Sequence, residues 1–103
     1  MNKLFINQPA IEYTDPKTGD IRLFMGYSHD DAYNYAAGAY DLYLRCIPEC
    51  CREGYLISDG SFRDRHEALQ IAKDANQLKD MYNNATVYDL YSYMLKEDYQ
   101  TCT

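Results

Sequence analysis

The sequence lacks any long hydrophobic run. No window approaches the roughly 18 to 20 continuous apolar residues that span a bilayer. The opening run Met1-Asn2-Lys3-Leu4-Phe5-Ile6-Asn7 is too short to serve as a signal peptide. We therefore expect no membrane partner and a cytoplasmic location.

Positive charge is also scarce. The chain has 10 Lys and Arg residues against 16 Asp and Glu residues, which gives a formal net charge of -6. Tight binding to a nucleic acid polymer depends on clustered basic groups that displace counterions, so this charge balance argues against such a partner. A small phosphate-bearing ligand is still compatible with the sequence, because two or three basic groups or a helix N-terminus can hold it.

The familiar catalytic and metal-binding motifs are missing as well. There is no G-x-S-x-G, no H-E-x-x-H, no phosphate-cradling G-x-x-x-x-G-K and no dinucleotide fingerprint. Cys46, Cys50, Cys51 and Cys102 lack the paired spacing of a structural zinc site. We expect these thiols to be packing residues, and we predict a protein that is not an enzyme and that needs no metal and no cofactor.

Tyrosine, by contrast, is abundant. The 103 residues fit one domain, residues 1–103, with a single hydrophobic core. Twelve of the apolar residues are Tyr, whose hydroxyl group favours half-exposed positions, so the purely aliphatic core is thin. A thin core in a small domain favours association, and we expect a homo-oligomer, a dimer or larger.

The N-terminal half predicts a β-hairpin followed by a helix. Residues 10–14 and 21–25 alternate between apolar and polar side chains, and the segment between them contains Pro16 and Gly19, which favour a turn. The capping pair Ser28 and Asp31 then predicts a helix that ends before Pro48. Within this helix Gly38 suggests a close contact with a neighbouring element.

The C-terminal half predicts a short β-turn unit and two more helices. The unit spans residues 54–62 around an Asp-Gly turn, one helix runs from Asp64 to about Leu78, and another runs from Thr86 to about Glu97. The expected fold is therefore α+β, with an N-terminal antiparallel β-hairpin or small sheet packed with three helices.

Two segments could bind a ligand. The first delivers Phe62, Arg63 and Arg65 just ahead of a helix N-terminus, where a ring, guanidinium groups and free amides could hold a nucleotide. An equally good interpretation places Phe62 in the core and pairs both arginines with acids. The second segment, Tyr27, Ser28 and His29, offers an aromatic residue beside another helix N-terminus.

The central sequence also resembles a known family. The run Glu53-Gly54-Tyr55-Leu56-Ile57-Ser58-Asp59-Gly60-Ser61-Phe62-Arg63-Asp64-Arg65-His66-Glu67-Ala68, continued by Ile71-Ala72-Lys73-Asp74-Ala75-Asn76-Gln77, is similar to a turn and helix in small phage proteins of the first Thoeris anti-defence family. Looser matches are Ala10-Ile11, Gly26-Tyr27-Ser28-His29-Asp30-Asp31, and the segments Leu90-Tyr91-Ser92 and Lys96-Glu97-Asp98-Tyr99.

The resemblance implies a function. Such proteins trap cyclic ADP-ribose signals in the host cytoplasm without degrading them, some also hold cyclic oligonucleotides, and some form dimers and hexamers. Among the candidate residues it reaches Phe62 and Arg65, and more loosely Ser28 and His29. The alternative is an acidic, Tyr-rich inhibitor that blocks a nucleic-acid-binding host defence enzyme by direct contact.

Overall fold

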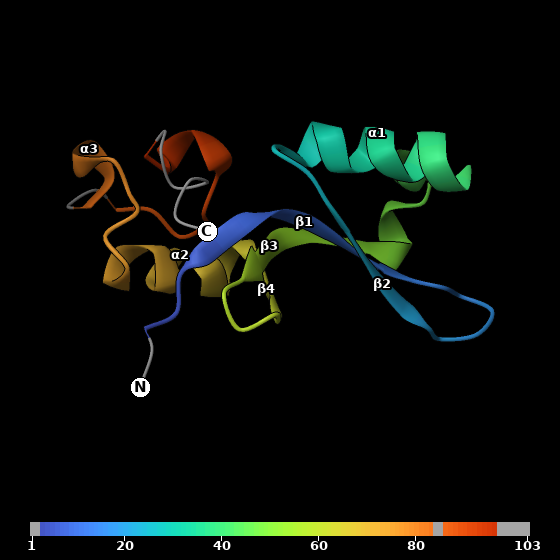
Figure 1. The fold of residues 1–103 in the computed structure, drawn as a ribbon, viewed down its shortest axis with the longest axis horizontal. Coiled ribbons are helices and arrows are strands. Elements are labelled where there is room, and N and C mark those ends of the chain that lie inside the picture. The colour runs from blue at the N-terminus through green and yellow to red at the C-terminus, as the bar shows by residue number, and fades with distance from the viewer. Residues whose placement is uncertain (1–2, 84–85, 97–103) are drawn as a thin grey trace.

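The computed structural model describes residues 3–83 and 86–96 and has a four-stranded antiparallel sheet in the order β2-β1-β3-β4 (Figure 1). The strands are β1 (Ile6–Thr14), β2 (Ile21–Met25), β3 (Cys51–Ile57) and β4 (Phe62–Asp64). Within the described residues the helices are α1 (His29–Tyr40), α2 (Arg65–Asp74) and α3 (Asp80–Asn83), and short 3-10 turns cover Leu44–Cys46, Pro48–Cys50 and Ser92–Met94. The predicted α+β class is confirmed.

The predicted hairpin is formed by β1 and β2. The Asp15 amide donates to the Asp20 carbonyl at 2.8 Å, and Gly19 has a φ of 79°, a left-handed conformation that favours glycine. In Figure 1 the hairpin turn lies at the opposite end of the molecule from α2 and α3. Pairing between β1 and β3, which joins the two halves of the chain, does not follow from the sequence pattern.

Two of the predicted helix starts, at Ser28 and Asp64, are also present. The Ser28 side chain accepts a hydrogen bond from the Asp31 amide at 3.0 Å, and the Asp64 side chain accepts one from the Glu67 amide at 2.9 Å. Each bond satisfies one of the amides that a helix N-terminus leaves without an intrahelical partner. Local capping chemistry therefore determines where both helices begin.

The buried residues form two clusters. In the first cluster α2 packs its small and aliphatic side chains on the aromatic and aliphatic residues of β3, including Tyr55 and Ile57. In the second cluster Ala32 and Ala36 of α1 pack on Ile11 and Phe24. The short alanine side chains let α1 lie close to the sheet.

The first helix is shorter than predicted. It ends at Tyr40, because Asp41 adopts a left-handed conformation with a φ of 57° and its amide bonds back to the Ala36 and Ala37 carbonyls. Tyr43, which the sequence placed on the apolar face of a longer helix, therefore lies beyond the end of α1 and is exposed. Two 3-10 turns, the second beginning at Pro48, replace the missing part of the helix.

The C-terminal helices also differ from the prediction. Helix α2 ends at Asp74 rather than near Leu78, and α3 was not predicted. No helix begins at Thr86. The Leu90 amide donates to the Arg65 carbonyl at 2.8 Å, so it bonds to the start of α2 and not to a carbonyl one turn earlier in its own segment. Only the turn Ser92–Met94 is helical there, and Glu97 lies outside the described residues.

The close backbone contact expected at Gly38 occurs at a different glycine. A Cβ atom at Gly38 would meet nothing within 4 Å, whereas one at Gly54 would lie 2.2 Å from the Arg63 carbonyl oxygen and 2.6 Å from the Phe62 ring. Strand β4 and the Phe62 ring thus approach β3 where a side chain is absent. Gly38 lies on the exposed side of α1, where no other element of the described residues comes near, so the expected close contact is not made within this part of the chain.

Candidate functional site

The two segments predicted to bind a ligand meet within one chain. His29 Nδ1 lies 3.4 Å from Arg65 Nη2, and the His29 and Tyr55 rings make an edge contact with centroids 5.2 Å apart. His29 Nε2 lies 2.8 Å from the Gly54 carbonyl oxygen. A carbonyl oxygen can only accept a hydrogen bond, so Nε2 carries a proton and donates it. This hydrogen bonding assigns the neutral imidazole with its proton on Nε2.

Both terminal nitrogens of the Arg65 guanidinium are already engaged by the protein. Its Nη1 donates to the Leu90 carbonyl at 2.9 Å and lies 3.5 Å from the Tyr55 hydroxyl, and its Nη2 lies 2.5 Å from the Glu53 carboxylate. The Tyr91 ring covers its face at 4.6 Å. Both terminal nitrogens therefore bond to groups of the chain itself. Arg65 is paired with an acid, as in the alternative interpretation of the sequence.

Glu53 holds this network together. One carboxylate oxygen accepts from Arg65 and the other accepts from the Tyr33 hydroxyl at 2.5 Å. Burial tends to raise the pKa of Glu53, but the hydrogen bonds from Tyr33 and Arg65 outweigh it and the pKa is lowered. Burial, with the charge of Arg65, lowers the pKa of His29, which agrees with the neutral ring.

The other predicted residues lie apart from this network. The Ser28 side chain is used as the N-cap of α1, and Tyr27 is exposed. Phe62 packs over Gly54 and under the Arg52 guanidinium, 5.2 Å from the ring centroid. Arg63 contacts Ser61 Oγ at 3.4 Å. Of the six predicted residues, only His29 and Arg65 are brought into direct contact by these bonds.

The predictions about thiols, metals and membranes concern the same described residues. Cys46, Cys50 and Cys51 are free thiols, burial raises the pKa of Cys51, and Cys102 lies outside the described residues. Residues 3–83 and 86–96 contain no group of three or more His, Cys, Asp and Glu side chains placed to hold a metal ion. In the same ranges no helix is both long and apolar enough to span a membrane.

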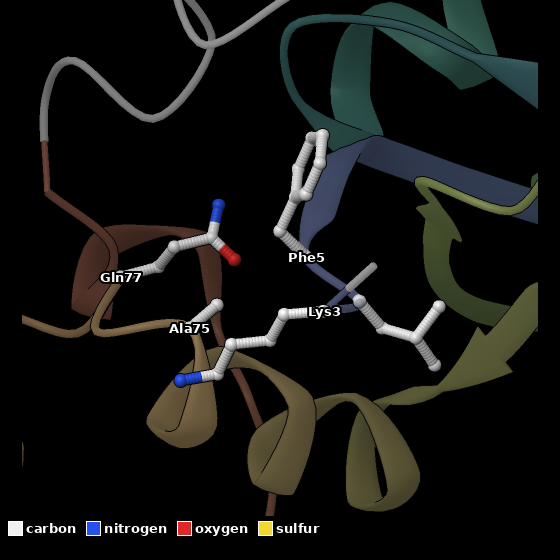
Figure 2. A pocket seen from close by; sticks show the side chains of 5 residues that line it. Lys3, Phe5, Ala75 and Gln77 are labelled. Carbon is white, nitrogen blue, oxygen red and sulfur yellow. The ribbon is translucent and has the colours of Figure 1, made fainter. Parts of the chain in front are cut away.

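One hollow lies between the N-terminal segment and the end of α2 (Figure 2). Its volume is about 240 Å³, and its lining residues are Lys3, Leu4, Phe5, Ala75 and Gln77. The Gln77 amide is already used, because its oxygen accepts from the Ile6 amide at 2.7 Å and its nitrogen donates to the Ile6 carbonyl at 3.0 Å. The hollow is therefore mainly apolar, and Gln77 serves to fix the start of β1.

A second hollow combines aromatic rings with a cation. Its volume is about 420 Å³, and it is lined by Gln8, Arg22, Leu23, Phe24, Met25, Tyr35 and Tyr40. We call it the Arg22 hollow. The guanidinium carbon of Arg22 lies 4.4 Å from the Tyr40 ring centroid and 5.5 Å from that of Phe24, and Tyr35 makes an edge contact with Tyr40 at 5.7 Å.

Arg22 differs from the other arginines that stack on rings. Arg45 pairs with Asp30, Arg52 pairs with Glu12, and Arg65 pairs with Glu53. No Asp or Glu side chain of residues 3–83 and 86–96 comes within ion-pairing distance of Arg22. In a chain with a net charge of -6, its positive charge and its N–H donors are available to an anion.

The Arg22 hollow was not found from the sequence. Arg22 and Phe24 are two residues apart in a strand, so the alternation that predicted β2 also places them on one face. Tyr40 lies on the predicted first helix at helical spacing from Ala32 and Ala36, which is also the pattern of an ordinary core-facing stripe. What the sequence could not show is that this helix packs across β2 and brings Tyr35 and Tyr40 to that face.

The fold and these contacts define a small α+β protein with an aromatic hollow built around an arginine. Comparison with known families identifies the group: the family model of the phage T4 y16D protein matches residues 5–97, and the chain belongs to that family. The phage assignment made from the sequence is thereby confirmed. No curated protein and no solved structure was found to match the chain.

Proposed function

We propose that this phage protein binds a cyclic nucleotide-type immune signal, such as a cyclic ADP-ribose isomer or a cyclic oligonucleotide, and holds it without degrading it. The observation that carries the proposal is the Arg22 hollow. Tyr35 and Tyr40, which are 51% and 44% exposed, supply ring faces and edges for a base, and Arg22 supplies unneutralised donors for a phosphate. The hollow, at about 420 Å³, has the size of a small-molecule site.

Calorimetric titration of the purified protein tests this proposal. Cyclic ADP-ribose isomers, cyclic dinucleotides and cyclic trinucleotides are titrated in turn, and at least one should bind and be recovered intact after incubation. Arg22→Gln should weaken binding about 10-fold to 100-fold, because a hydrogen bond to a charged group contributes about 1.5 to 3 kcal/mol. Failure of every ligand to bind would refute the proposed function.

Matched controls locate the site. Arg63→Gln removes a second arginine that has no acid partner among the described residues and lies outside the Arg22 hollow, so it should leave the affinity unchanged. The sequence-based assignment, in which Phe62 stacks on the base and Arg63 and Arg65 meet phosphates, predicts the reverse, with Phe62→Ala and Arg63→Gln weakening binding. Loss of affinity in those two variants alone would move the ligand to the turn at Gly60.

A second candidate function is supported by the exposed tyrosines near the C-terminus. Tyr91 and Tyr93 stack with centroids 5.7 Å apart, and Tyr88 is 70% exposed. Tyrosine is enriched at protein interfaces, and the acidic chain could occupy the basic cleft of a nucleic-acid-binding host enzyme. Such binding should weaken as salt rises and should be lost in Tyr93→Ala, whereas binding of a small signal should depend on Arg22.

A further inference from the structure

The outer edge of β2 has no neighbour within the described residues. β2 is the first strand in the sheet order, so only its inner edge pairs with β1. Natural edge strands usually carry lysine, proline or a bulge that prevents pairing with another chain. β2 has the sequence Ile-Arg-Leu-Phe-Met and pairs with β1 in a continuous register, so it has no lysine, proline or bulge. Its one charged side chain, Arg22, stacks on the Tyr40 and Phe24 rings of its own chain.

The hydrogen bonds between β1 and β2 show which backbone N–H and C=O groups of β2 face outward. Asp15 bonds to Asp20 at one end of the hairpin, and the Gly26 amide donates to the Pro9 carbonyl at 3.2 Å at the other end. Hydrogen-bonded pairs alternate with non-bonded pairs in an antiparallel ladder, so Arg22 and Phe24 also bond to β1.

The backbone N–H and C=O groups of Ile21, Leu23 and Met25 therefore point outward from the edge of the sheet, on the side of β2 opposite β1. Their side chains share one face, where Ile21 is 62% exposed and Met25 is 36% exposed. The outer edge of β2 thus offers both unpaired peptide groups and apolar side chains to a partner strand.

We propose that two copies of the chain pair through this edge, with β2 antiparallel to β2 and the two-fold axis at Leu23. In this register Leu23 faces the partner's Leu23 and Ile21 faces the partner's Met25. Both are hydrogen-bonded pairs, because the outward peptide groups belong to these residues. The strand is thus complementary to itself, as a two-fold interface requires.

Charge selects the same edge. Most surfaces of a chain with a net charge of -6 repel a second copy. β2 contains no acid, and its one charged residue, Arg22, faces the partner's Phe24. Asp20, which precedes the strand, faces the partner's Gly26. No acid therefore meets an acid along the paired strands.

Pairing also changes the Arg22 hollow, a consequence that rests on the proposed function. The hollow is lined by β2 residues, and the partner's Arg22 would lie directly opposite Phe24, one of its walls. Directly opposed residues in a non-bonded pair have Cα atoms about 4.5 Å apart. Each hollow then gains a second guanidinium, which suits a ligand with two negative charges such as a pyrophosphate.

Sedimentation velocity of the ligand-free protein over a concentration series tests the interface independently of any ligand. The wild type should form a dimer. Leu23→Pro removes an outward N–H that β1 does not use, and it should shift the protein to the monomer with its circular dichroism spectrum retained. A wild type that stays monomeric, or a folded Leu23→Pro variant that still dimerises, would overturn the inference.

Two charge variants test the register itself. I21K/M25K places like charges opposite each other in both halves of the interface and should abolish the dimer, whereas I21K/M25E places opposite charges there and should restore it. The two variants differ only at position 25, so equal dimerisation would refute this register. Calorimetry on the same samples separates the proposals, because a dimer that binds no nucleotide refutes only the proposed function.

Discussion

Replacing Arg65 with methionine tests whether this arginine is a structural residue. The substitution keeps much of the aliphatic stem and removes the guanidinium, whose side chain is only 19% exposed. Loss of the charge-assisted hydrogen bond to Leu90 costs about 1.5 to 3 kcal/mol. Loss of the Glu53 pair adds about 0.5 to 1 kcal/mol, a discounted figure because the Glu53 side chain is 37% exposed.

The expected decrease in the free energy of unfolding is therefore about 3 kcal/mol, a large part of the roughly 5 to 15 kcal/mol of a small domain. Urea denaturation followed by circular dichroism measures it, and thermal unfolding should show a midpoint lower by roughly 12 °C or more.

The neighbouring arginine provides a matched control. Within the described residues the Arg63 side chain makes one long hydrogen bond, to Ser61 Oγ at 3.4 Å, so Arg63→Met should change the free energy of unfolding by about 0.5 kcal/mol or less. If Arg65→Met destabilised the protein no more than Arg63→Met does, the Arg65 hydrogen-bond network would have no structural importance. Arg65 would then again be a candidate for contact with a ligand.

Further outcomes follow from the same contacts. Burial lowers the pKa of His29 below its ordinary value of 6.5, so the stability that its neutral ring contributes should be fully present above pH 6.5. The free energy of unfolding should fall as the pH drops from 6.5 toward the lowered pKa, by up to about 1.4 kcal/mol per pH unit. His29→Gln should flatten this part of a urea denaturation series across pH. Gly54→Ala should destabilise the protein by about 2 kcal/mol or more in the same assay, because its Cβ would lie 2.2 Å from the Arg63 carbonyl oxygen. Gly38→Ala adds a Cβ that meets no atom within 4 Å, and it should stabilise the protein by about 0.5 to 1 kcal/mol. Equal effects of the two glycine substitutions would contradict the packing of β4 on β3.

The local elements were largely predictable, because short-range chemistry determines them. The turn at Gly19 needs a positive φ that glycine tolerates, and the caps at Ser28 and Asp64 satisfy amides only three residues away. Helix ends were predicted less well. Asp41 ends α1 in a left-handed conformation to which the apolar periodicity gives no guide.

The candidate sites depended on contacts between distant parts of the chain. Arg65 could equally have met a phosphate or an acid. Pairing of β3 with β4 places Glu53 beside it, and packing of α1 on the sheet brings His29 there. The same holds for Arg22, whose aromatic neighbours Tyr35 and Tyr40 come from α1. The sequence contains the residue types of a candidate binding site but does not show which of them remain unneutralised.

The sequence by itself therefore determined the class of fold, the hairpin, two helix starts and the acidic, Tyr-rich surface, since each depends on composition or on residues a few positions apart. The tertiary structure alone decided which arginine is used internally and which stays available. The physical reason is that a guanidinium is neutralised by whichever carboxylate the fold brings within about 4 Å, and that distance is set by strand pairing and helix packing over tens of residues.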